Sequence, residues 1–243
     1  MDKVVLVTGG GRGIGAATSI LLGQQGYLVC VNYRKDQESA ERVVSNIRAH
    51  GGQALAVQAD VAVEEQVRAM FDLITETFGH VTHLVNNAGI LFTQSTLSDI
   101  SVERFNQVLQ TNVIGCFLCC KEALKNMPES GAIVNVSSAA SRTGAPNEYV
   151  DYAASKGAMD SLTKGLSLEV AAKGIRVNSV RPGCIHTEMH KDGGEANRVN
   201  RLANKIPLQR GGTAEEVAQS IAWLLSDEAS FVTGSFIDIA GGL

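Results

Sequence analysis

The chain has 243 residues, of which 44% are hydrophobic and 19% charged, the balance of an ordinary globular protein long enough to bury a sizeable core. Its formal net charge of −4 offers no general attraction to nucleic acid or anionic lipid, and no apolar run approaches the about 20 residues that span a bilayer. Five cysteines without a small-domain framework, and no cleavable apolar segment ahead of the first strand, lead us to expect a cytoplasmic protein without nucleic acid or membrane as a partner.

The first predicted element is a short buried strand, Lys3 to Thr8, which a glycine-rich turn joins to a helix from Ala16 to Gln25. Glycines permit a tight turn and close approach of a ligand to the backbone, and a helix N-terminus presents free N–H groups to a pyrophosphate. Strand, glycine turn and helix are the context that a dinucleotide site requires. The turn residues expected to contact a dinucleotide are Gly9, Gly11, Arg12, Gly13, Ile14 and Gly15.

The second predicted strand, Tyr27 to Asn32, completes an opening βαβ unit and leads into Asn32-Tyr33-Arg34. Sites that prefer NAD place a carboxylate about 20 residues past the glycines, whereas an arginine there accommodates the 2′-phosphate of NADP. No carboxylate occurs here before Asp36. Arg34 together with Arg12 could clamp a phosphate, which favours NADP(H); the alternative is that both are ordinary surface charges.

Strands and helices alternate through the remainder of the chain. This alternation predicts one α/β domain over residues 1–243, a Rossmann-type doubly wound sheet of about seven mainly parallel strands with helices on both faces. Composition marks residues 187–208 as an irregular lid or substrate loop. The expected helices span residues 39–50, 64–78, 104–126 and about 152–172. A last helix is expected to begin at a capping box formed by Thr213 and Glu216 and to end at residue 226. The expected strands span residues 54–58, 82–85, 131–136, 175–180 and 235–239.

Polar or small residues follow several of these strands. In a doubly wound sheet the carboxyl ends of the strands border the ligand crevice. Asp60-Val61, Asn86-Asn87-Ala88-Gly89, Ser137-Ser138 and Arg181-Pro182-Gly183 all stand at such ends. Asn112, inside a helical region, is by itself best interpreted as a hydrogen-bonded core amide.

Tyr152 and Lys156 are four residues apart, so on a helix they share one face. A nearby cation favours the phenolate and lowers the pKa of a tyrosine, which then becomes a proton donor or acceptor near neutral pH. The spacing also arises by chance, and its meaning depends on the other motifs.

No metal site is expected. The segment Cys116-Phe117-Leu118-Cys119-Cys120 contains one Cys-x-x-Cys but no second pair, and is predicted to pack inside a helix. His186 and His190 are four residues apart, yet no third ligand accompanies them at a suitable spacing.

Taken together, four sets of residues make the sequence similar to the short-chain dehydrogenase/reductase family over essentially its whole length. They are Thr8-Gly9-x-x-x-Gly13-x-Gly15, Asn86-Asn87-Ala88-Gly89, Arg181-Pro182-Gly183 and a tetrad of Asn112, Ser138, Tyr152 and Lys156. Within the family the chain most resembles 3-oxoacyl-carrier-protein reductases and glucose 1-dehydrogenases. It departs from the family pattern at Ala62 and Ala240, neither of which touches the chemistry.

The resemblance implies an NAD(P)-dependent oxidoreductase that reduces a 3-oxoacyl-type or similar ketone with NADPH. Ser138 would donate a hydrogen bond to the substrate oxygen, Tyr152 would deliver the proton, and Lys156 would lower the tyrosine pKa and bind the nicotinamide ribose. Asn112 would hold a water that connects Lys156 to solvent. Two alternatives stay open: oxidation of a sugar or secondary alcohol, and a catalytically idle NADP(H)-binding sensor.

The resemblance also implies an extended cofactor site and a homotetramer, assembled through the helices that hold Asn112 and Tyr152 and through the C-terminal segment. Besides the glycine turn, the implied cofactor contacts are Asn32, Tyr33, Arg34, Asp60, Val61, Asn87, Ala88, Gly89, Tyr152, Lys156, Pro182, Gly183, Ile185 and Thr187.

Overall fold

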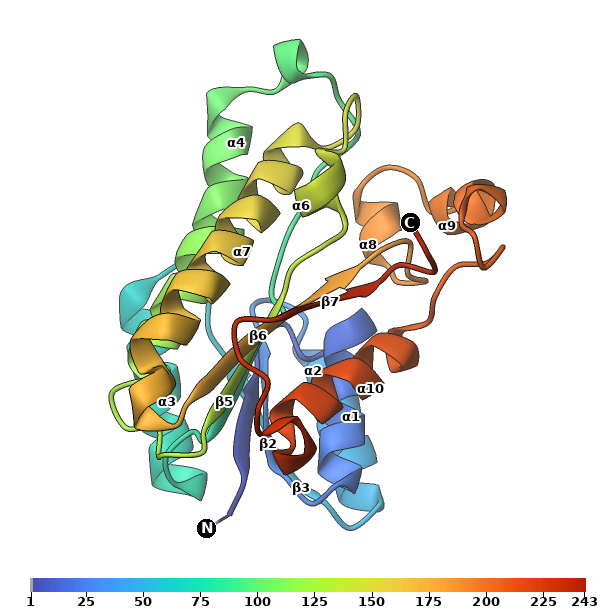
Figure 1. Ribbon diagram of the computed structural model, residues 1–243. Coiled ribbons are helices and arrows are strands. Elements are labelled where there is room, and N and C mark those ends of the chain that lie inside the picture. Colours follow the sequence, from blue (N-terminus) through green and yellow to red (C-terminus); the bar gives the residue numbers. More distant parts are fainter. Residues whose placement is uncertain (1) are drawn as a thin grey trace.

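A seven-stranded, wholly parallel sheet forms the centre of the computed structural model, which describes residues 2–243 (Figure 1). Residue 1 of the predicted domain lies outside the described residues. The strand order is β3-β2-β1-β4-β5-β6-β7, which confirms the predicted Rossmann-type fold. The strands are β1 (Val4–Val7), β2 (Leu28–Tyr33), β3 (Gln53–Gln58), β4 (His83–Asn86), β5 (Ala132–Val136), β6 (Arg176–Pro182) and β7 (Phe236–Ile239).

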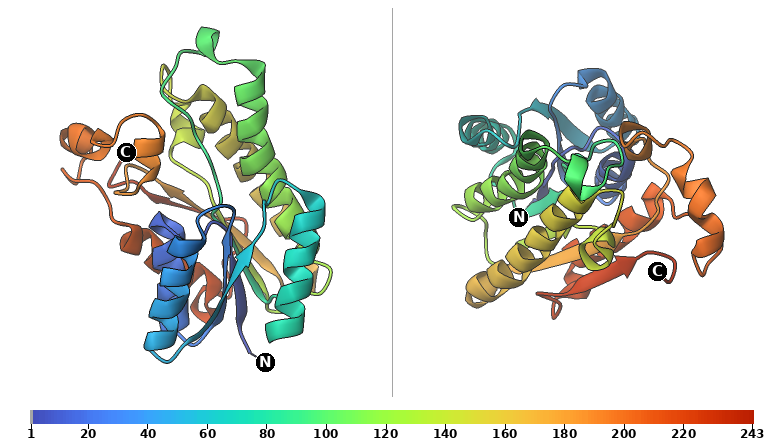
Figure 2. Two further views of the ribbon diagram at one scale, coloured as in Figure 1. Left: turned by 180° about the vertical axis from the view of Figure 1, so that it is seen from behind. Right: turned by 90° about the horizontal axis from the view of Figure 1, so that it is seen from above.

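Helices cover both faces of the sheet, as Figures 1 and 2 show. One face packs against α1 (Gly13–Gln24), α2 (Gln37–Ala49) and α10 (Ala214–Leu225), and the other against α3 (Glu64–Phe78), α5 (Gly115–Ala123) and α7 (Val150–Val170). A further helix, α4 (Val102–Leu109), lies beside α7. Shorter helices are α6 (Ala140–Thr143), α8 (Met189–Asp192) and α9 (Arg198–Leu202), with single 3-10 turns at 97–99, 171–173, 203–205 and 227–229. None of the helices within 2–243 has the length and apolar character needed to cross a bilayer.

The sheet is buried on both sides, which explains the near-continuous apolar composition of its central strands. In β1, Leu6 points into one core with Met70 and Ile74 of α3. Val5 and Val7 point the other way, into the core that α1, α2 and α10 close. Successive strand residues face opposite sides, so one short apolar run serves two cores.

The predicted helix 104–126 is not one regular helix. A π-helix of five residues, Gln110–Ile114, separates α4 from α5. Asn112 lies in this segment, fully buried, and its side chain bonds to the backbone of Ile90. A π-turn is a local widening that often marks a functional site, and it carries no signal in apolar periodicity.

The segment 187–208 is more regular than predicted, because it contains α8, α9 and a 3-10 turn. Ion pairs and hydrogen bonds to distant parts of the chain anchor it: Arg198 binds both carboxylate oxygens of Glu148 at 2.6 Å, and Gln94 donates to Glu195 at 2.9 Å. Such contacts depend on the tertiary fold, so the composition of the segment alone could not predict its helices.

Both ends of α10 are satisfied, as a stable helix requires. The predicted capping box is confirmed: Thr213 N donates to Glu216 Oε2 at 2.8 Å, and Glu216 N donates to Thr213 Oγ1 at 3.3 Å. At the other end the Arg176 guanidinium donates to the carbonyls of Leu224, Leu225 and Ser226.

His83 is a buried titratable group at the start of β4. Its Nδ1 lies 2.7 Å from Thr82 Oγ1, and its ring meets the edge of Tyr27 with centroids 5.1 Å apart. Burial, helped by the cations Lys3 and Arg176, lowers the pKa of His83 to about 4.

Since this pKa lies below the ordinary 6.5, the unfolded chain takes up a proton first as the pH falls. The contribution of neutral His83 to stability is therefore complete above about pH 6.5 and is lost towards about pH 4, amounting to about 3 kcal/mol. Urea unfolding across this range should show the loss, and His83→Leu should flatten it. Equal pH slopes in the two proteins would contradict the assignment.

Candidate active site

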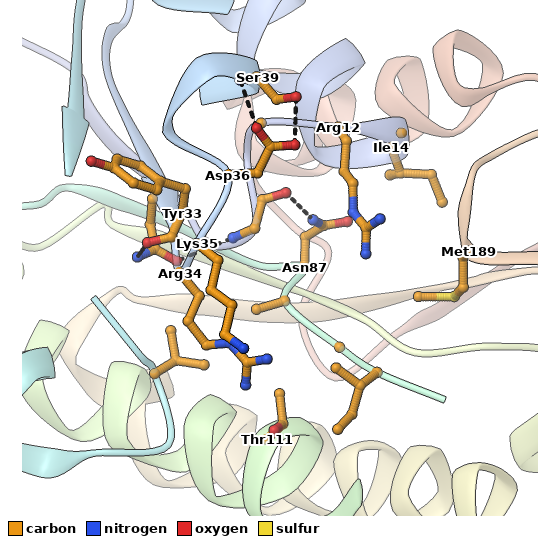
Figure 3. A pocket seen from close by; sticks show the side chains of 18 of the residues that line it. Arg12, Ile14, Tyr33, Arg34, Lys35, Asp36, Ser39, Asn87, Thr111 and Met189 are labelled. Atoms are coloured by element: carbon orange, nitrogen blue, oxygen red, sulfur yellow. Dashed lines mark hydrogen bonds between the residues drawn. The ribbon is translucent and has the colours of Figure 1, made fainter. Parts of the chain in front are cut away.

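A cavity of about 390 Å³ opens at the carboxyl ends of β1 to β4 (Figure 3). The chain leaves β3 at one sheet edge and re-enters as β4 beside β1, so the cavity lies at the switch point where doubly wound sheets bind ligands. Its walls include predicted cofactor residues Gly9, Gly11, Arg12, Gly13, Ile14, Asn32, Tyr33, Arg34, Asp60, Val61, Asn87, Ala88, Gly89 and Thr187.

The remaining predicted cofactor residues, Gly15, Tyr152, Lys156, Pro182, Gly183 and Ile185, lie outside these walls. Gly15 is packed beneath the turn: an added Cβ would lie 2.3 Å from Gly9 O and 2.5 Å from Asn87 Nδ2. Lys156 lies just beyond the wall, since a Cβ on Gly89 would be 3.5 Å from its Nζ. Ile185 borders a separate cavity of about 330 Å³ between β7 and α10.

Two asparagines hold the glycine turn in shape. Gly9 N donates to Asn32 Oδ1 at 3.2 Å, and the Asn32 amide donates to Val57 O and Ala59 O. Asn87 Nδ2 donates to the carbonyls of Thr8 and Gly9 at 2.9 and 3.0 Å. Asn32 is only 2% exposed and its polar atoms bond to the backbone, so it supports the turn; its predicted contact with the cofactor stays a prediction.

The turn is also joined to the end of β4. Thr8 Oγ1 accepts hydrogen bonds from the backbone N–H groups of Asn87 and Ala88, both at 3.0 Å. Residues nearly 80 positions apart therefore form one continuous wall.

Three cations, Arg12, Arg34 and Lys35, line the cavity. Arg12 pairs with Asp192 of α8 at 2.8 Å, and Arg34 pairs with Asp60 at 3.6 Å, all four side chains being at least a quarter exposed. Exposed pairs of this kind contribute about 0 to 1 kcal/mol, so a phosphate can displace them.

Asp36, the first carboxylate after β2 in the sequence, is already engaged. Asp36 caps α2, accepting from Ser39 N at 3.0 Å and from Ser39 Oγ at 2.7 Å (Figure 3). These hydrogen bonds lower the pKa of Asp36. The predicted cofactor residues do not include eight of the residues that line the cavity: Lys35, Asp36, Ser39, Ala59, Ile90, Thr111, Glu188 and Met189. Of these, Lys35 offered a signal as a cation next to Arg34.

Lys156 and Tyr152 share one face of α7, as predicted, and both are buried. Lys156 Nζ lies 5.5 Å from the Tyr152 ring centroid and donates to Val136 O, at the end of β5, at 2.7 Å. It also approaches Met159 Sδ at 3.4 Å.

The expected fall in the tyrosine pKa is wrong for this structure. Burial raises the pKa of Tyr152 to about 12, opposed by the Ser138 side chain. Burial lowers the pKa of Lys156 to about 8, opposed by Cys116 and Asp160. The lysine ammonium donates to Val136 O and lies 5.5 Å from the centre of the Tyr152 ring, and burial has the larger effect on the tyrosine pKa.

Ser138 and Asn112 complete the candidate tetrad. Ser138 Oγ accepts from Ala140 N at 3.1 Å, which leaves its own proton available to a ligand. The Asn112 amide makes three hydrogen bonds: its Oδ1 accepts from Ile90 N, and its Nδ2 donates to Ile90 O and Ser155 Oγ. Both amide N–H groups are used, so a relay water would have to donate to an oxygen of the residue.

Ser137 has a different partner from its neighbour. Its hydroxyl donates to the Lys156 carbonyl at 3.2 Å. This hydrogen bond joins the end of β5 to α7, at the helical turn that carries the lysine.

The cysteine and histidine pairs do not build a metal centre. Cys116, Cys119 and Cys120 are buried in α5, and burial raises the pKa of the Cys119 thiol well above its usual range. Across residues 2–243, nowhere do three His, Cys, Asp or Glu side chains gather as metal ligands.

Known proteins resemble this chain closely. A family model described as "Enoyl-(Acyl carrier protein) reductase" matches residues 9–243. The chain is 62% identical to the uncharacterized oxidoreductase YgfF of Escherichia coli (strain K12), over 98% of this chain and 99% of the relative. It is 38% identical to the 3-oxoacyl-acyl-carrier-protein reductase FabG of Staphylococcus aureus (strain Mu50), over 100% of this chain and 98% of the relative.

A solved structure supplies the same fold. A short chain dehydrogenase from Burkholderia cenocepacia J2315, in complex with NADP, superposes with a TM-score of 0.92 at 36% identity. The match covers 99% of this chain and 97% of that one.

The contacts of Gly15 lead to a prediction. Gly15→Ala should open the turn, weakening dinucleotide binding about tenfold or more and costing about 1 to 3 kcal/mol of stability. Ala17→Gly in the same helix is the control, because it costs about 1 kcal/mol of helix propensity and leaves the turn intact. Fluorescence titration and urea unfolding of both variants measure the two effects; equal dinucleotide affinities would contradict the packing argument.

Proposed function

This chain belongs to the short-chain dehydrogenase/reductase family of NAD(P)-dependent oxidoreductases, and from that premise we propose that it reduces a ketone to a secondary alcohol with NADPH. The proposed substrate is a 3-oxoacyl-type or similar carbonyl compound. The observation that carries the proposal is the geometry of three side chains: the buried Tyr152 lies beside the Ser138 side chain, and Lys156 stands one helical turn away on the same helix.

The residues of the cavity fit a dinucleotide. The glycine turn and the N-terminus of α1 suit a pyrophosphate. Residues 87–89 line the part of the cavity nearest to Lys156. When bound, NADPH would supply the hydride that reaches the carbonyl carbon.

Local charge supports NADP(H) over NAD(H). Arg12, Arg34 and Lys35 border the place where the first βαβ unit ends, and they suit a 2′-phosphate. The carboxylate that could bind ribose hydroxyls instead, Asp36, is engaged at the start of α2. The solved relative in complex with NADP adds weight to this choice.

The protonation states support reduction. With a pKa of about 12, Tyr152 carries its proton at neutral pH and can give it to a developing alkoxide. Ser138 would donate a hydrogen bond to the same oxygen, which orients the carbonyl and stabilises negative charge. Lys156 would hold the cofactor ribose and favour the transient phenolate after proton transfer.

The proposal extends to the organisation of the protein. We infer one Rossmann domain, a cytoplasmic location and a homotetramer. Exposed apolar side chains beside the helices of the tetrad support assembly: Ile114 and Phe117 are 39% and 44% exposed, and Leu168 of α7 is 69% exposed.

Tyr152→Phe tests the catalytic assignment. The change keeps the ring and removes the proton, so turnover should fall about 100-fold or more while NADPH binding is kept. The assay is NADPH oxidation over acyl thioesters, diketones, quinones and sugars, run in both directions. Retention of more than a few per cent of the wild-type kcat would exclude Tyr152 as the proton donor. NADPH binding without turnover of any compound by the wild type would support the sensor alternative.

Arg34→Asp tests the cofactor preference. It removes a phosphate partner and adds repulsion, so the NADPH:NADH ratio of kcat/KM should fall about tenfold or more. Arg68→Asp, the same change in an exposed pair on α3, is the matched control and should leave the ratio unaltered. An unaltered ratio in Arg34→Asp would make that residue an ordinary surface charge.

A further inference from the structure

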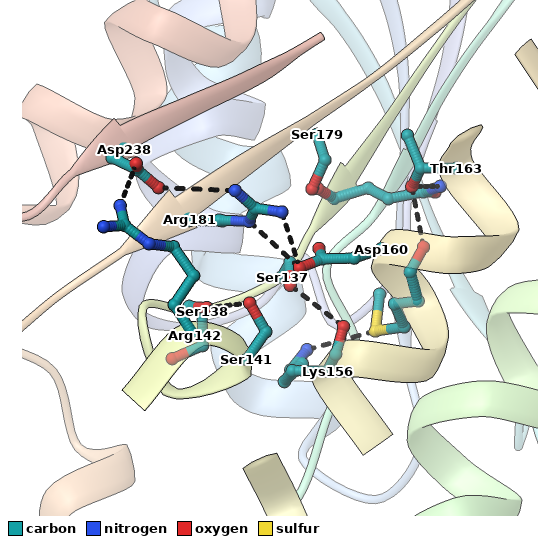
Figure 4. Close-up of polar contacts among 12 residues, drawn as sticks. Ser137, Ser138, Ser141, Arg142, Lys156, Asp160, Thr163, Ser179, Arg181 and Asp238 are labelled. Carbon is teal, nitrogen blue, oxygen red and sulfur yellow. Dashed lines mark hydrogen bonds and ion pairs between the residues drawn. The ribbon is translucent and has the colours of Figure 1, made fainter. Parts of the chain in front are cut away.

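Four charged side chains of alternating sign form a chain behind the tetrad (Figure 4). Arg142 of α6 pairs with Asp238 of β7, Asp238 approaches Arg181 of β6 at 3.9 Å, and Arg181 pairs with Asp160 of α7. The four residues come from four different elements, of which α6, α7 and β6 follow one another in the sequence and β7 comes from the end of the chain. We call them the charge chain.

The inner pair is the best protected part of the charge chain. Arg181 Nε and Nη2 lie 3.0 and 2.9 Å from Asp160 Oδ2, and the two side chains are 17% and 14% exposed. The guanidinium carbon also lies 4.0 Å from the centroid of the Phe236 ring. Arg142 is 53% exposed, so water and salt weaken the outer link.

Asp160 stands one helical turn beyond Lys156 on the same face of α7. Its Oδ1 is buried and has no hydrogen-bond partner within residues 2–243, so negative charge remains directed into the protein. The groups that act on Lys156 are Cys116 of α5, Asp160 and Tyr152 of α7, and the Val136 carbonyl of β5. Among these, Asp160 is the carboxylate.

The neighbours of Arg181 and Arg142 make hydrogen bonds with the segment that carries Ser138. Pro182, next to Arg181, accepts a hydrogen bond from Ala139 N at 2.9 Å. Ser141, next to Arg142, donates to the Ser138 carbonyl at 2.9 Å. The elements that carry Ser138 and Lys156 are thus tied to the same ends of β6 and β7.

We propose that Asp160, held by Arg181, is a positioning residue for the catalytic lysine. The ion pair fixes the Lys156 turn of α7 against the end of β6, and the free carboxylate oxygen supplies negative charge near the buried ammonium. This role rests on the proposed reductase function, and it concerns a residue that contacts neither the cavity nor the reacting atoms. Burying the Arg181–Asp160 pair carries a desolvation cost, and the pair in turn positions Lys156 and supplies a negative charge near it.

Asp160→Asn separates charge from shape. The amide keeps the size of the side chain and one acceptor for Arg181 while removing the negative charge, so kcat should fall about tenfold. The pH at which Lys156 loses its proton should also move down by about one unit, because the carboxylate favours the ammonium. A purely structural role would lower kcat and leave this pH unchanged.

Carbon-13 NMR of lysine labelled at Cε reads the protonation of Lys156 without any turnover, with Lys156→Met used to assign the signal. Asp227→Asn is the matched control: it removes a carboxylate from an exposed pair with Lys3, near the opposite ends of the strands. We expect the titration midpoint of Lys156 in Asp227→Asn to equal that of the wild type. An unshifted Lys156 signal in folded Asp160→Asn would overturn the proposal, whether or not the reductase assay gives activity.

Arg181→Lys provides a second variant should Asp160→Asn fail to fold. It keeps the positive charge but loses the two-atom contact that holds the Asp160 carboxylate in place, so both kcat and the pH at which Lys156 loses its proton should fall below the wild-type values. Wild-type kcat in this variant would overturn the positioning role. Absence of activity in the wild type would count against the reductase proposal alone, because the NMR titration still tests Asp160.

Discussion

The arrangement of the site depends on burying one ammonium group. Lys156 is 3% exposed, and removing a cation from water is costly unless polar groups replace the lost hydration. The Val136 carbonyl does so directly at 2.7 Å, and it is available because β5 ends there. The Ser137 hydroxyl and the Arg181–Asp160 pair then hold α7 against β5 and β6. The position of the lysine thus follows from where two parallel strands stop.

Features encoded within a few residues were predictable from the sequence. The glycine turn, the Thr213 capping box and the shared face of Tyr152 and Lys156 each depend on local spacing, and the structure has all three. The parallel sheet followed from the alternation of apolar runs with amphipathic helices. These signals place the cavity, since the carboxyl ends of parallel strands meet at one edge.

What the sequence could not predict depends on contacts between distant residues. The π-helix forms where Asn112 meets Ile90, and α8 and α9 are anchored through Glu148 and Gln94. The pKa of Tyr152 was misjudged for the same reason: spacing places a cation nearby, but only the fold shows how completely the phenol is buried and which way the ammonium points. The supporting role of Asn32 in the turn was likewise hidden, because its partners at the end of β3, Val57 and Ala59, are more than 20 residues away in the sequence.

The joint between Thr8 and residues 87–88 has a consequence for how the protein folds. These hydrogen bonds close a loop of nearly 80 residues, and β1 pairs with β4 across the same interval. Closing such a loop costs conformational entropy before any stabilising contact forms. The pairing of β1 with β4 therefore belongs to the slow, non-local part of folding. Either half alone would lack a complete wall of the cavity. A ligand that occupies the finished cavity would therefore bind only the fully assembled sheet, and by mass action it would stabilise the whole fold and not the turn alone.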